Sequence, residues 1–272
     1  MATALSSRPV VLLKASHPAP CVAVTALTAL LAIAAGHGLV TGLLVTAAVA
    51  AGQLSIGWSN DLIDATRDRK VGRPDKPIAR GEVSAGLVRR AVAVALFLCV
   101  VLSLACGLAA AAVHLFLGVA SGWGYNLCFK RTAWSALPYA LAFGSLPAVV
   151  TLALPDPELP PLWTFFAGAL LGVGAHLLNV LPDLADDAST GVHGLPHRLG
   201  ERRVRVLAPL VLLAASCVVV LGPGTPGSPA PWAALGACVV LALMAVTSRG
   251  RIPFLAAIGI ALVDVASLVL RG

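Results

Sequence analysis

Two short acidic segments carry half of the acidic residues of an otherwise apolar chain. The first runs Asn60-Asp61-Leu-Ile-Asp64-Ala-Thr-Arg-Asp68, and the second runs Asp183-Leu-Ala-Asp186-Asp187. Together they hold six of the twelve Asp and Glu residues of the 272-residue sequence, which is 58% hydrophobic and only 11% charged. Carboxylates gathered beside apolar segments repel one another and resist the loss of water, so they need a compensating cation. These residues predict binding of a magnesium-bound phosphate or diphosphate.

The spacing of the first segment favours a single wall of oxygen ligands. If the chain stays helical there, Asp61, Asp64 and Asp68 share one face, because steps of three, four and seven residues return close to the starting angle. Asn60, Asp64 and Asp68 form an overlapping ladder at four-residue steps. The sequence therefore predicts a helix face of hard ligands suited to Mg²⁺.

The second segment repeats the four-residue step far along the chain. Asp183 and Asp187 follow another hydrophobic stretch, and Pro182 is expected to redirect the chain there. A single Asp near a membrane is more often a solvated loop residue, but recurrence at two distant helix ends favours a site. Two such walls facing one another would hold Mg²⁺ ions with a diphosphate between them.

Basic residues follow both acidic segments. Most of them are explained by membrane topology alone, but a diphosphate leaving group needs hydrogen-bond donors beyond the metal. We expect Arg73, Lys76 and Lys130 to supply them.

The composition of the chain indicates a membrane protein, so these acidic segments are expected to lie beside a bilayer. A mean hydropathy of +0.92 excludes an ordinary soluble protein. The pattern predicts an all-α, polytopic membrane helix bundle: about nine transmembrane helices around a central cavity with a cytoplasmic cap, forming a single domain over residues 1–272. The predicted spans are 19–36, 39–58, 88–106, 109–127, 134–153, 162–181, 204–222, 231–247 and 252–270.

Charge placement orients this bundle. With the N-terminus cytoplasmic, nearly all basic residues fall in or beside cytoplasmic loops, and Arg271 alone falls on the other side. The active-site loops are then cytoplasmic as well. The net charge of +7 is a topology signal with affinity for anionic lipid, and it requires no nucleic-acid partner. The first span shows no clear cleavage site and is expected to be retained.

Other polar residues within or near the spans have weaker claims to function. The spacing of His193 and His197 suggests zinc, but the Gly and Pro residues between them disfavour the helix that would align the rings. His114 and His176 are interpreted as hydrogen-bonded packing residues. Asp264 lies within an apolar helix, where an acid is costly without a partner, and no partner is identifiable from sequence. The six scattered cysteines predict neither a disulfide framework nor a zinc site.

The acidic segments resemble the signatures of the UbiA superfamily of intramembrane prenyltransferases. The first signature, Asn-Asp-x-x-Asp-x-x-x-Asp, matches the segment from Asn60 to Asp68, and the second, Asp-x-x-x-Asp, matches Asp183 and Asp187. The resemblance extends from about residue 14 to the end of the sequence and includes the nine-helix count. Further similar elements are Arg69, Arg73-Pro74-x-Lys76-Pro77-Ile78, Gly81-x-x-Ser84, Tyr125-Asn126-x-x-x-Lys130-Arg131-Thr132, Gly191 and Leu195-Pro-His-Arg-Leu-Gly200.

Three positions depart from the family pattern. Val180 stands where many members have an additional Asp, Lys76 where many have Arg, and His17-Pro18 where Arg-Pro is common. These departures leave the expected metal ligands intact. They weaken inference about the subfamily and the acceptor.

The resemblance implies Mg²⁺-dependent transfer of a prenyl group from an allylic diphosphate to a small acceptor, commonly aromatic, within the lipid bilayer. Asp61 or Asp186 is expected to stabilise the cation, to take the acceptor's proton or to support the metal ligands. The implied residues are Asn60, Asp64, Asp68, Asp183 and Asp187 for the metal; Arg73, Lys76, Tyr125, Asn126 and Lys130 for the diphosphate; and Asp61, Asp64, Asp68, Asp183, Asp187 and Lys130 for catalysis.

Two alternatives remain open at the level of sequence. A membrane terpene cyclase would use the same ionisation step but close the cation on its own tail. An ion-coupled transporter is disfavoured, because transporters place ion sites near the bilayer midplane on broken helices, whereas these acidic segments lie at the bilayer boundary.

Overall fold

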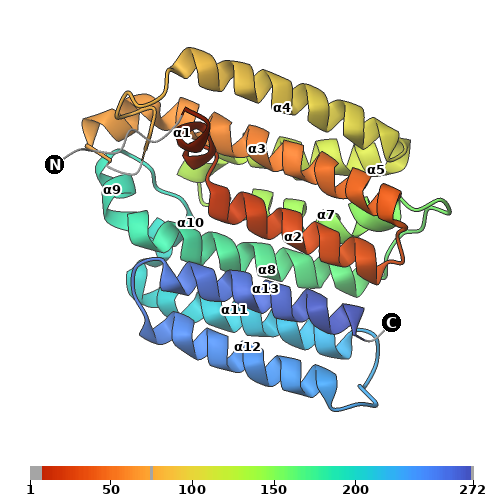
Figure 1. Ribbon diagram of the computed structural model, residues 1–272. Coiled ribbons are helices and arrows are strands. Elements are labelled where there is room, and N and C mark those ends of the chain that lie inside the picture. The colour runs from red at the N-terminus through yellow and green to blue at the C-terminus, as the bar shows by residue number, and fades with distance from the viewer. Residues whose placement is uncertain (1–7, 74–75, 271–272) are drawn as a thin grey trace.

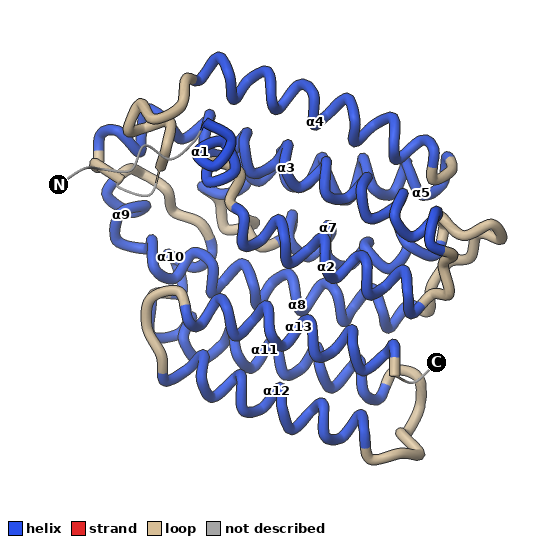
Figure 2. Tube along the Cα trace, in the orientation of Figure 1, coloured by secondary structure: helices blue, strands red, loops and turns tan. Residues whose placement is uncertain are grey.

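The protein is a bundle of long helices with several short helices gathered at one end (Figure 1). The computed structural model describes residues 8–73 and 76–270, so that Pro74 and Arg271, named above, lie outside the described residues. Figure 2 shows helices joined by loops throughout the described chain. The elements are α1 (Arg8–Lys14), α2 (Pro18–Ala34), α3 (Leu39–Lys70), α4 (Ala85–Ala105), α5 (Leu108–Val113), the π-helix η1 (His114–Val119), α6 (Ala120–Leu127), the 3₁₀ turn η2 (Phe129–Arg131), α7 (Leu137–Thr151), α8 (Leu162–Val180), the 3₁₀ turn η3 (Leu181–Asp183), α9 (Leu184–Ser189), α10 (Leu195–Leu199), α11 (Glu201–Leu221), α12 (Ala230–Thr247) and α13 (Ile252–Val269).

Within the described chain, each of the nine predicted spans corresponds to a helix or a continuous helical run. The seven that are long and apolar enough to cross a membrane are α3, α4, the run from α5 to α6, the run from α8 to α9, α11, α12 and α13. The remaining two, α2 and α7, are apolar but shorter. The predicted all-helical, multi-pass bundle is therefore confirmed.

The outward surface of the bundle is apolar, as a protein surrounded by lipid requires. Large hydrophobic side chains such as Phe97 on α4, Phe116 on η1 and Leu243 on α12 are well exposed. In water such a surface would mark an interaction site, but along helices of this length it is suited to contact acyl chains. The buried interior is instead built from smaller residues, many of them Ala and Val.

The helix α3 extends beyond the predicted membrane span. The predicted membrane span ends at residue 58, where polar residues begin, and α3 continues through the first acidic segment to Lys70. Most charged residues tolerate a helix well, and the carboxylates of this extension face basic partners, so nothing local breaks the helix. It ends where Gly72 adopts a φ of 65°, a left-handed conformation that glycine adopts without penalty.

The helices α7 and α8 pack closely against each other along a seam. At Gly168 and Gly172 an added Cβ would collide with the backbone carbonyls of Phe143 and Tyr139, so only glycine permits this approach. Such small-residue contacts are a common way of packing membrane helices. The seam places Tyr139 of α7 beside His176 of α8, close to the second acidic segment.

Both acidic segments lie at the same end of the bundle, which we call the motif end. The C-terminal part of α3 reaches it from one side, and α8 leads into η3 and α9 on the other (Figure 1). The short helices α1, α9 and α10 lie at this end as well. The fold thus brings together two segments that are more than one hundred residues apart in the sequence.

Candidate active site

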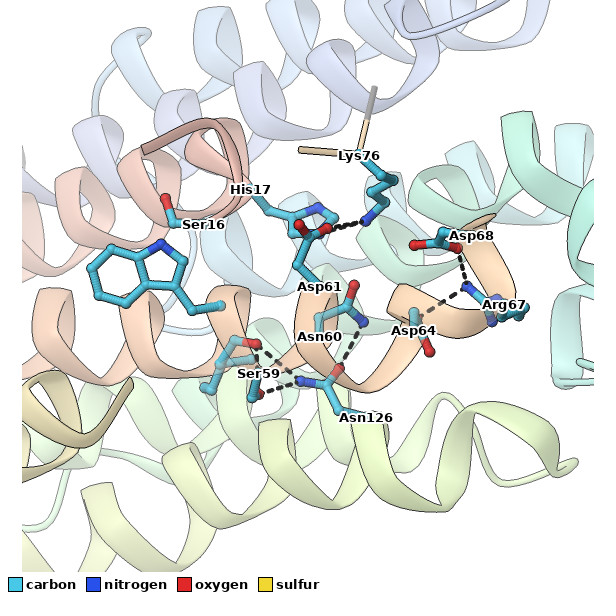
Figure 3. A network of polar contacts seen from close by, with 12 residues as sticks. Ser16, His17, Ser59, Asn60, Asp61, Asp64, Arg67, Asp68, Lys76 and Asn126 are labelled. Carbon is cyan, nitrogen blue, oxygen red and sulfur yellow. Dashed lines mark hydrogen bonds and ion pairs between the residues drawn. The ribbon is translucent and has the colours of Figure 1, made fainter. Parts of the chain in front are cut away.

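The first acidic segment is one continuous face of α3, as the spacing predicts. Asp61, Asp64 and Asp68 are all buried, and they lie along the same stretch of helix (Figure 3). Buried carboxylates are stable only when cations or hydrogen-bond donors compensate them. Each of the three has a basic side chain nearby, but the partners differ.

Asp64 is the most tightly paired carboxylate of the site. Lys130, from the 3₁₀ turn after α6, donates a hydrogen bond to Asp64 Oδ1, and both side chains are only 4% exposed. Burial lowers the pKa of Lys130 below its ordinary value, and the charge of Asp64 opposes this shift. The predicted diphosphate-binding lysine is therefore an internal counterion in this state of the site.

Arg67 links the two acidic segments. Its Nη2 lies 3.0 Å from Asp64 Oδ2, 3.4 Å from Asp68 Oδ1 and 3.6 Å from Asp187 Oδ1. One positively charged nitrogen thus lies among carboxylates from both segments, which shows that the two walls face the same point. Our sequence prediction omitted Arg67 from the site. The available signal was its position three residues after Asp64, on the same face of the helix.

The second acidic segment is built differently from the first. The helix α8 ends at Val180, and the chain makes a 3₁₀ turn through Pro182 before α9 begins at Leu184. The side chain of Asp183 is 39% exposed, and that of Asp187 is 16% exposed. This 3₁₀ turn lies at Pro182, where the sequence predicts a change in the course of the chain, and the four-residue step from Asp183 to Asp187 spans the start of α9.

Arg73 joins this second segment to the loop that follows α3. Its Nη1 lies 3.1 Å from Asp183 Oδ1. Like Lys130, this residue was predicted to bind diphosphate, and it here pairs with a carboxylate of the site. Both basic groups are therefore positioned beside the acidic segments, where they could turn toward an anionic ligand.

Lys76 and His17 surround Asp61. Lys76 Nζ lies 3.1 Å from Asp61 Oδ1 and 2.8 Å from His17 Nε2, while His17 Nε2 is 3.9 Å from the same carboxylate oxygen (Figure 3). The three groups come from α3, from the loop after it and from the residue before α2. These contacts connect the N-terminal part of the chain to the loop that covers the motif end.

Asn60 and Asn126 connect α3 to α6. Asn60 Nδ2 donates to Asn126 Oδ1 at 3.0 Å, and Asn126 Nδ2 donates to Ser59 Oγ at 2.9 Å and to the Ile56 carbonyl at 3.0 Å (Figure 3). The amide of Asn126 is therefore used within the protein. The hydrogen bond to Asn126 fixes the orientation of the Asn60 side-chain amide and leaves Asn60 Oδ1 available as an acceptor.

Aromatic rings from α6, α7 and α8 pack together near the two acidic segments. The rings of Tyr125 and Tyr139 meet edge to face at 5.1 Å, and His176 lies 4.6 Å from Tyr139 and 5.5 Å from Tyr125. His176 Nε2 is 3.0 Å from Ser135 Oγ, as expected for a hydrogen-bonded packing residue, while its Nδ1 is buried without a hydrogen-bond partner in the described structure. Tyr139, His176 and Ser135 were not among the predicted site residues, because they share no spaced motif.

The donor set of the site fits Mg²⁺ in chemical type. Carboxylate and amide oxygens are the ligands that this ion prefers. Asp68 Oδ2 is buried and has no hydrogen-bond donor among the residues that the structure describes. Within the same residues, no group of three or more His, Cys, Asp or Glu side chains is arranged to hold an ion, because basic side chains separate the carboxylates. Cation binding would therefore require the exchange of internal ion pairs.

The remaining residues singled out from the sequence lie at the edge of the site or outside it. Asp186 is exposed on α9. Burial lowers the pKa of His197, whose Nε2 is 3.8 Å from Asp187 Oδ2. Asp264 is buried between α11, α12 and α13, where it accepts hydrogen bonds from Ser216 at 2.9 Å and Cys238 at 3.5 Å.

Comparison with known proteins agrees with this arrangement. A family model described as the UbiA prenyltransferase family matches residues 22–252. No curated protein matches the sequence significantly.

Solved structures show the same fold at low sequence identity. A UbiA homologue from Archaeoglobus fulgidus bound to GPP and Mg²⁺ superposes with a TM-score of 0.70 at 16% identity, covering 96% of this chain and 100% of that chain. An apo UbiA homologue from Aeropyrum pernix K1 gives 0.74 at 17% identity, covering 91% and 97%. A digeranylgeranylglyceryl phosphate synthase gives 0.62 at 16% identity, covering 96% and 97%.

Proposed function

Since the chain belongs to the UbiA prenyltransferase family, a family of transferases, we propose that it moves a prenyl group from an allylic diphosphate to a small, electron-rich acceptor within the membrane, with Mg²⁺ as cofactor. The observation that carries this proposal is the position of Arg67 Nη2 among Asp64, Asp68 and Asp187. The same carboxylate oxygens that hold this cation are suited to hold a divalent one. Two structures of a UbiA homologue from Archaeoglobus fulgidus, one bound to GPP and Mg²⁺ and the other to DMAPP and Mg²⁺, support the choice of ligand.

The residues that would hold the ion are Asn60, Asp64, Asp68, Asp183 and Asp187. When bound, Mg²⁺ supplies a Lewis acid that neutralises the diphosphate. The chain itself supplies basic groups at the same place. Lys130 and Arg73 are each engaged with one of these carboxylates, so both lie within reach of a diphosphate that arrives between the acidic segments. Lys76 is turned toward Asp61, which favours a role in positioning the loop above the site.

The reaction follows from this placement of charge. The allylic C–O bond breaks, and the diphosphate leaves with the bonding electron pair. The resulting allylic cation is attacked by a carbon of the acceptor, which then loses a proton. The rings of Tyr125 and Tyr139 offer π-faces near the motif end, and such faces attract cations. Charge is thus stabilised where the diphosphate departs, while the apolar bundle shields the cation from water.

The position relative to the membrane belongs to the same proposal. We place the motif end, and with it the N-terminus, on the cytoplasmic side, because its loops carry most of the basic residues. The donor's tail would then enter the apolar bundle sideways from the bilayer. The diphosphate would remain at the boundary between hydrocarbon and water.

The test is a product assay with purified protein. The protein is incubated with Mg²⁺, with allylic diphosphates of increasing length and with a panel of aromatic and lipid acceptors, and the products are identified by mass. We expect diphosphate release that requires Mg²⁺ and a prenylated acceptor. A cyclised hydrocarbon formed from the diphosphate alone would instead establish the terpene cyclase alternative.

Two variants test the site itself. Asp64→Ala and Asp183→Ala should each abolish diphosphate release while membrane insertion is retained. Asp156→Ala is the matched control, because Asp156 is an exposed acid in the loop between α7 and α8, at the opposite end of these helices. Full activity in either site variant would contradict the assignment of the two acidic segments.

A further inference from the structure

A small cavity lies inside the bundle below the candidate site. It measures about 30 Å³, and it is lined by Gln53 of α3, by His114 and Gly118 of η1 and by apolar side chains of α2, α3 and α7. A volume of this size admits one or two groups as large as a water or a methyl. The cavity is otherwise apolar, so its two polar side chains distinguish it from ordinary packing defects.

The cavity is aligned with the acidic wall. Gln53 precedes Asn60 by seven residues and Asp64 by eleven, and both steps return to nearly the same angle on a helix. Gln53 therefore lies on the face of α3 that carries the predicted metal ligands, roughly 10 Å deeper than Asn60 along the axis. The cavity and the aromatic part of the site also share the run from η1 to α6 and the helix α7.

The backbone beside the cavity is irregular. His114 and Gly118 belong to a six-residue π-helical segment within the run that otherwise forms α5 and α6. Such π-segments are rare and are frequently found at functional sites. A Cβ on Gly118 would meet only the His114 ring, at 3.2 Å, and would otherwise extend into open space. The missing side chain of Gly118 is thus part of what leaves the cavity open.

Hydrogen bonds fix the state of His114. The Ser103 hydroxyl donates to the Cys99 carbonyl at 2.6 Å, so its oxygen accepts from His114 Nδ1 at 2.8 Å. The hydrogen of the neutral ring is therefore on Nδ1, and Nε2 of this cavity-lining residue is an acceptor without a hydrogen-bond partner among the residues that the structure describes. In the described part of the chain, the Gln53 amide also has no hydrogen-bond partner.

The Gln53 amide and the His114 imidazole disfavour the entry of a longer alkyl chain. Covering an amide or imidazole with an alkyl chain removes access to water without supplying a partner, which is unfavourable. The other side chains that line the cavity are apolar and impose no such penalty. A prenyl tail that descends from the acidic wall would therefore be favoured until it reaches Gln53 and His114, and disfavoured beyond them.

We propose that this cavity receives the distal end of the prenyl chain and that Gln53 and His114 form a polar floor which limits the length of the donor. This inference depends on the proposed function, because it assigns the tail of the same substrate. Gly118 sets the depth of the cavity, and the two polar side chains set the cost of exceeding it.

The test compares two variants that act in opposite directions. Gln53→Met keeps a linear side chain but removes the amide, and it should raise kcat/KM for geranylgeranyl relative to geranyl diphosphate by roughly tenfold. Gly118→Ala adds a methyl group to the cavity and should lower the same ratio by roughly tenfold. Gly236→Ala is the control, since Gly236 lies on α12 with nothing near its Cβ position and should leave the ratio unchanged.

A binding measurement separates tail recognition from turnover. Thermal unfolding without acceptor measures how strongly geranyl, farnesyl and geranylgeranyl thiodiphosphate stabilise each variant. Relative to the wild type, the preference for the longer analogues should increase in Gln53→Met and decrease in Gly118→Ala. An unchanged preference in both variants with intact turnover would overturn the polar floor but not the proposed function. An increase in acceptor KM with an unchanged length profile would overturn it as well. Failure of the wild-type chain to release diphosphate from any donor would overturn both proposals.

Discussion

The two acidic segments meet at one point but are constructed in opposite ways. The first belongs to the uninterrupted helix α3, and its carboxylates are buried and paired with Arg67 and Lys130. The second follows a break in the helix at Pro182, and Asp183 is 39% exposed. One wall is thus a buried face of a long helix, whereas the other spans a 3₁₀ turn and the short helix α9, which has no buried residue. We expect the first to set the geometry of the site and the second to adjust to what is bound.

The largest effect should follow from breaking the buried pair. Asp64→Ala leaves the Lys130 ammonium buried without a partner, and we expect it to lower the free energy of unfolding by about 3 to 5 kcal/mol. Denaturant unfolding in detergent measures this change. The double variant Asp64→Leu with Lys130→Met should recover most of the loss, because it removes both charges. A loss below about 1 kcal/mol in the single variant would show that the first wall is not fixed by this pair.

Substitution of Arg67 tests whether Mg²⁺ binds at the point where the two acidic segments meet. Arg67→Gln removes a cation that competes with Mg²⁺ for oxygens of Asp64, Asp68 and Asp187. We expect the Mg²⁺ concentration for half-maximal diphosphate release to fall by about tenfold, which corresponds to about 1.4 kcal/mol. Arg69→Gln is the matched control, because Arg69 is an exposed arginine on the same helix. An unchanged or higher Mg²⁺ requirement would argue that the metal binds elsewhere.

The second wall should separate stability from activity. Asp183→Ala removes a half-exposed carboxylate whose ion pair with Arg73 is accessible to water, so the free energy of unfolding should change by less than about 1 kcal/mol. Diphosphate release should nevertheless be lost. The comparison with Asp64→Ala in the same unfolding assay is decisive, since equal destabilisation would mean that the two walls do not differ.

The smallest effect is expected at Asp186. Its side chain is exposed on α9, whereas Asp187, the next residue, faces Arg67. Asp186→Ala should change the free energy of unfolding by no more than about 0.5 kcal/mol. It should also leave kcat close to the wild-type value. A tenfold fall in kcat with a normal KM for the diphosphate would instead support the early expectation that Asp186 accepts the acceptor's proton.

Much of the fold and the identity of the acidic segments could be predicted from sequence. Hydropathy located the nine apolar helices or helical runs of the described chain, and four-residue spacing identified the acids that the structure brings together. Hydropathy and residue spacing can be recognised in the sequence because each pattern lies within a single helix. The spacing of the acids indicated that the helix continues beyond the apolar span, but the ion pair of Asp64 with Lys130, far away in the sequence, could not be predicted.

Contacts between helices were beyond sequence reasoning for the same reason. The position of Arg67 between the walls, the aromatic group of Tyr125, Tyr139 and His176, and the cavity at Gln53 all depend on how separate helices pack. No periodicity encodes these contacts. The partners of Asp264 were likewise identifiable only once α11, α12 and α13 were placed together.

The partners of Asp264 also bear on how the chain enters the membrane. A carboxyl group at the centre of an isolated helix raises the free energy of insertion by about 2.5 to 3.5 kcal/mol, so α13 alone is a poorer candidate for insertion than its other residues indicate. Ser216 and Cys238, which donate hydrogen bonds to this carboxyl group, belong to α11 and α12, both of which are synthesised before α13. During biosynthesis the last helix therefore finds its donors already in place, and its integration is best understood as joining a preformed helical pair.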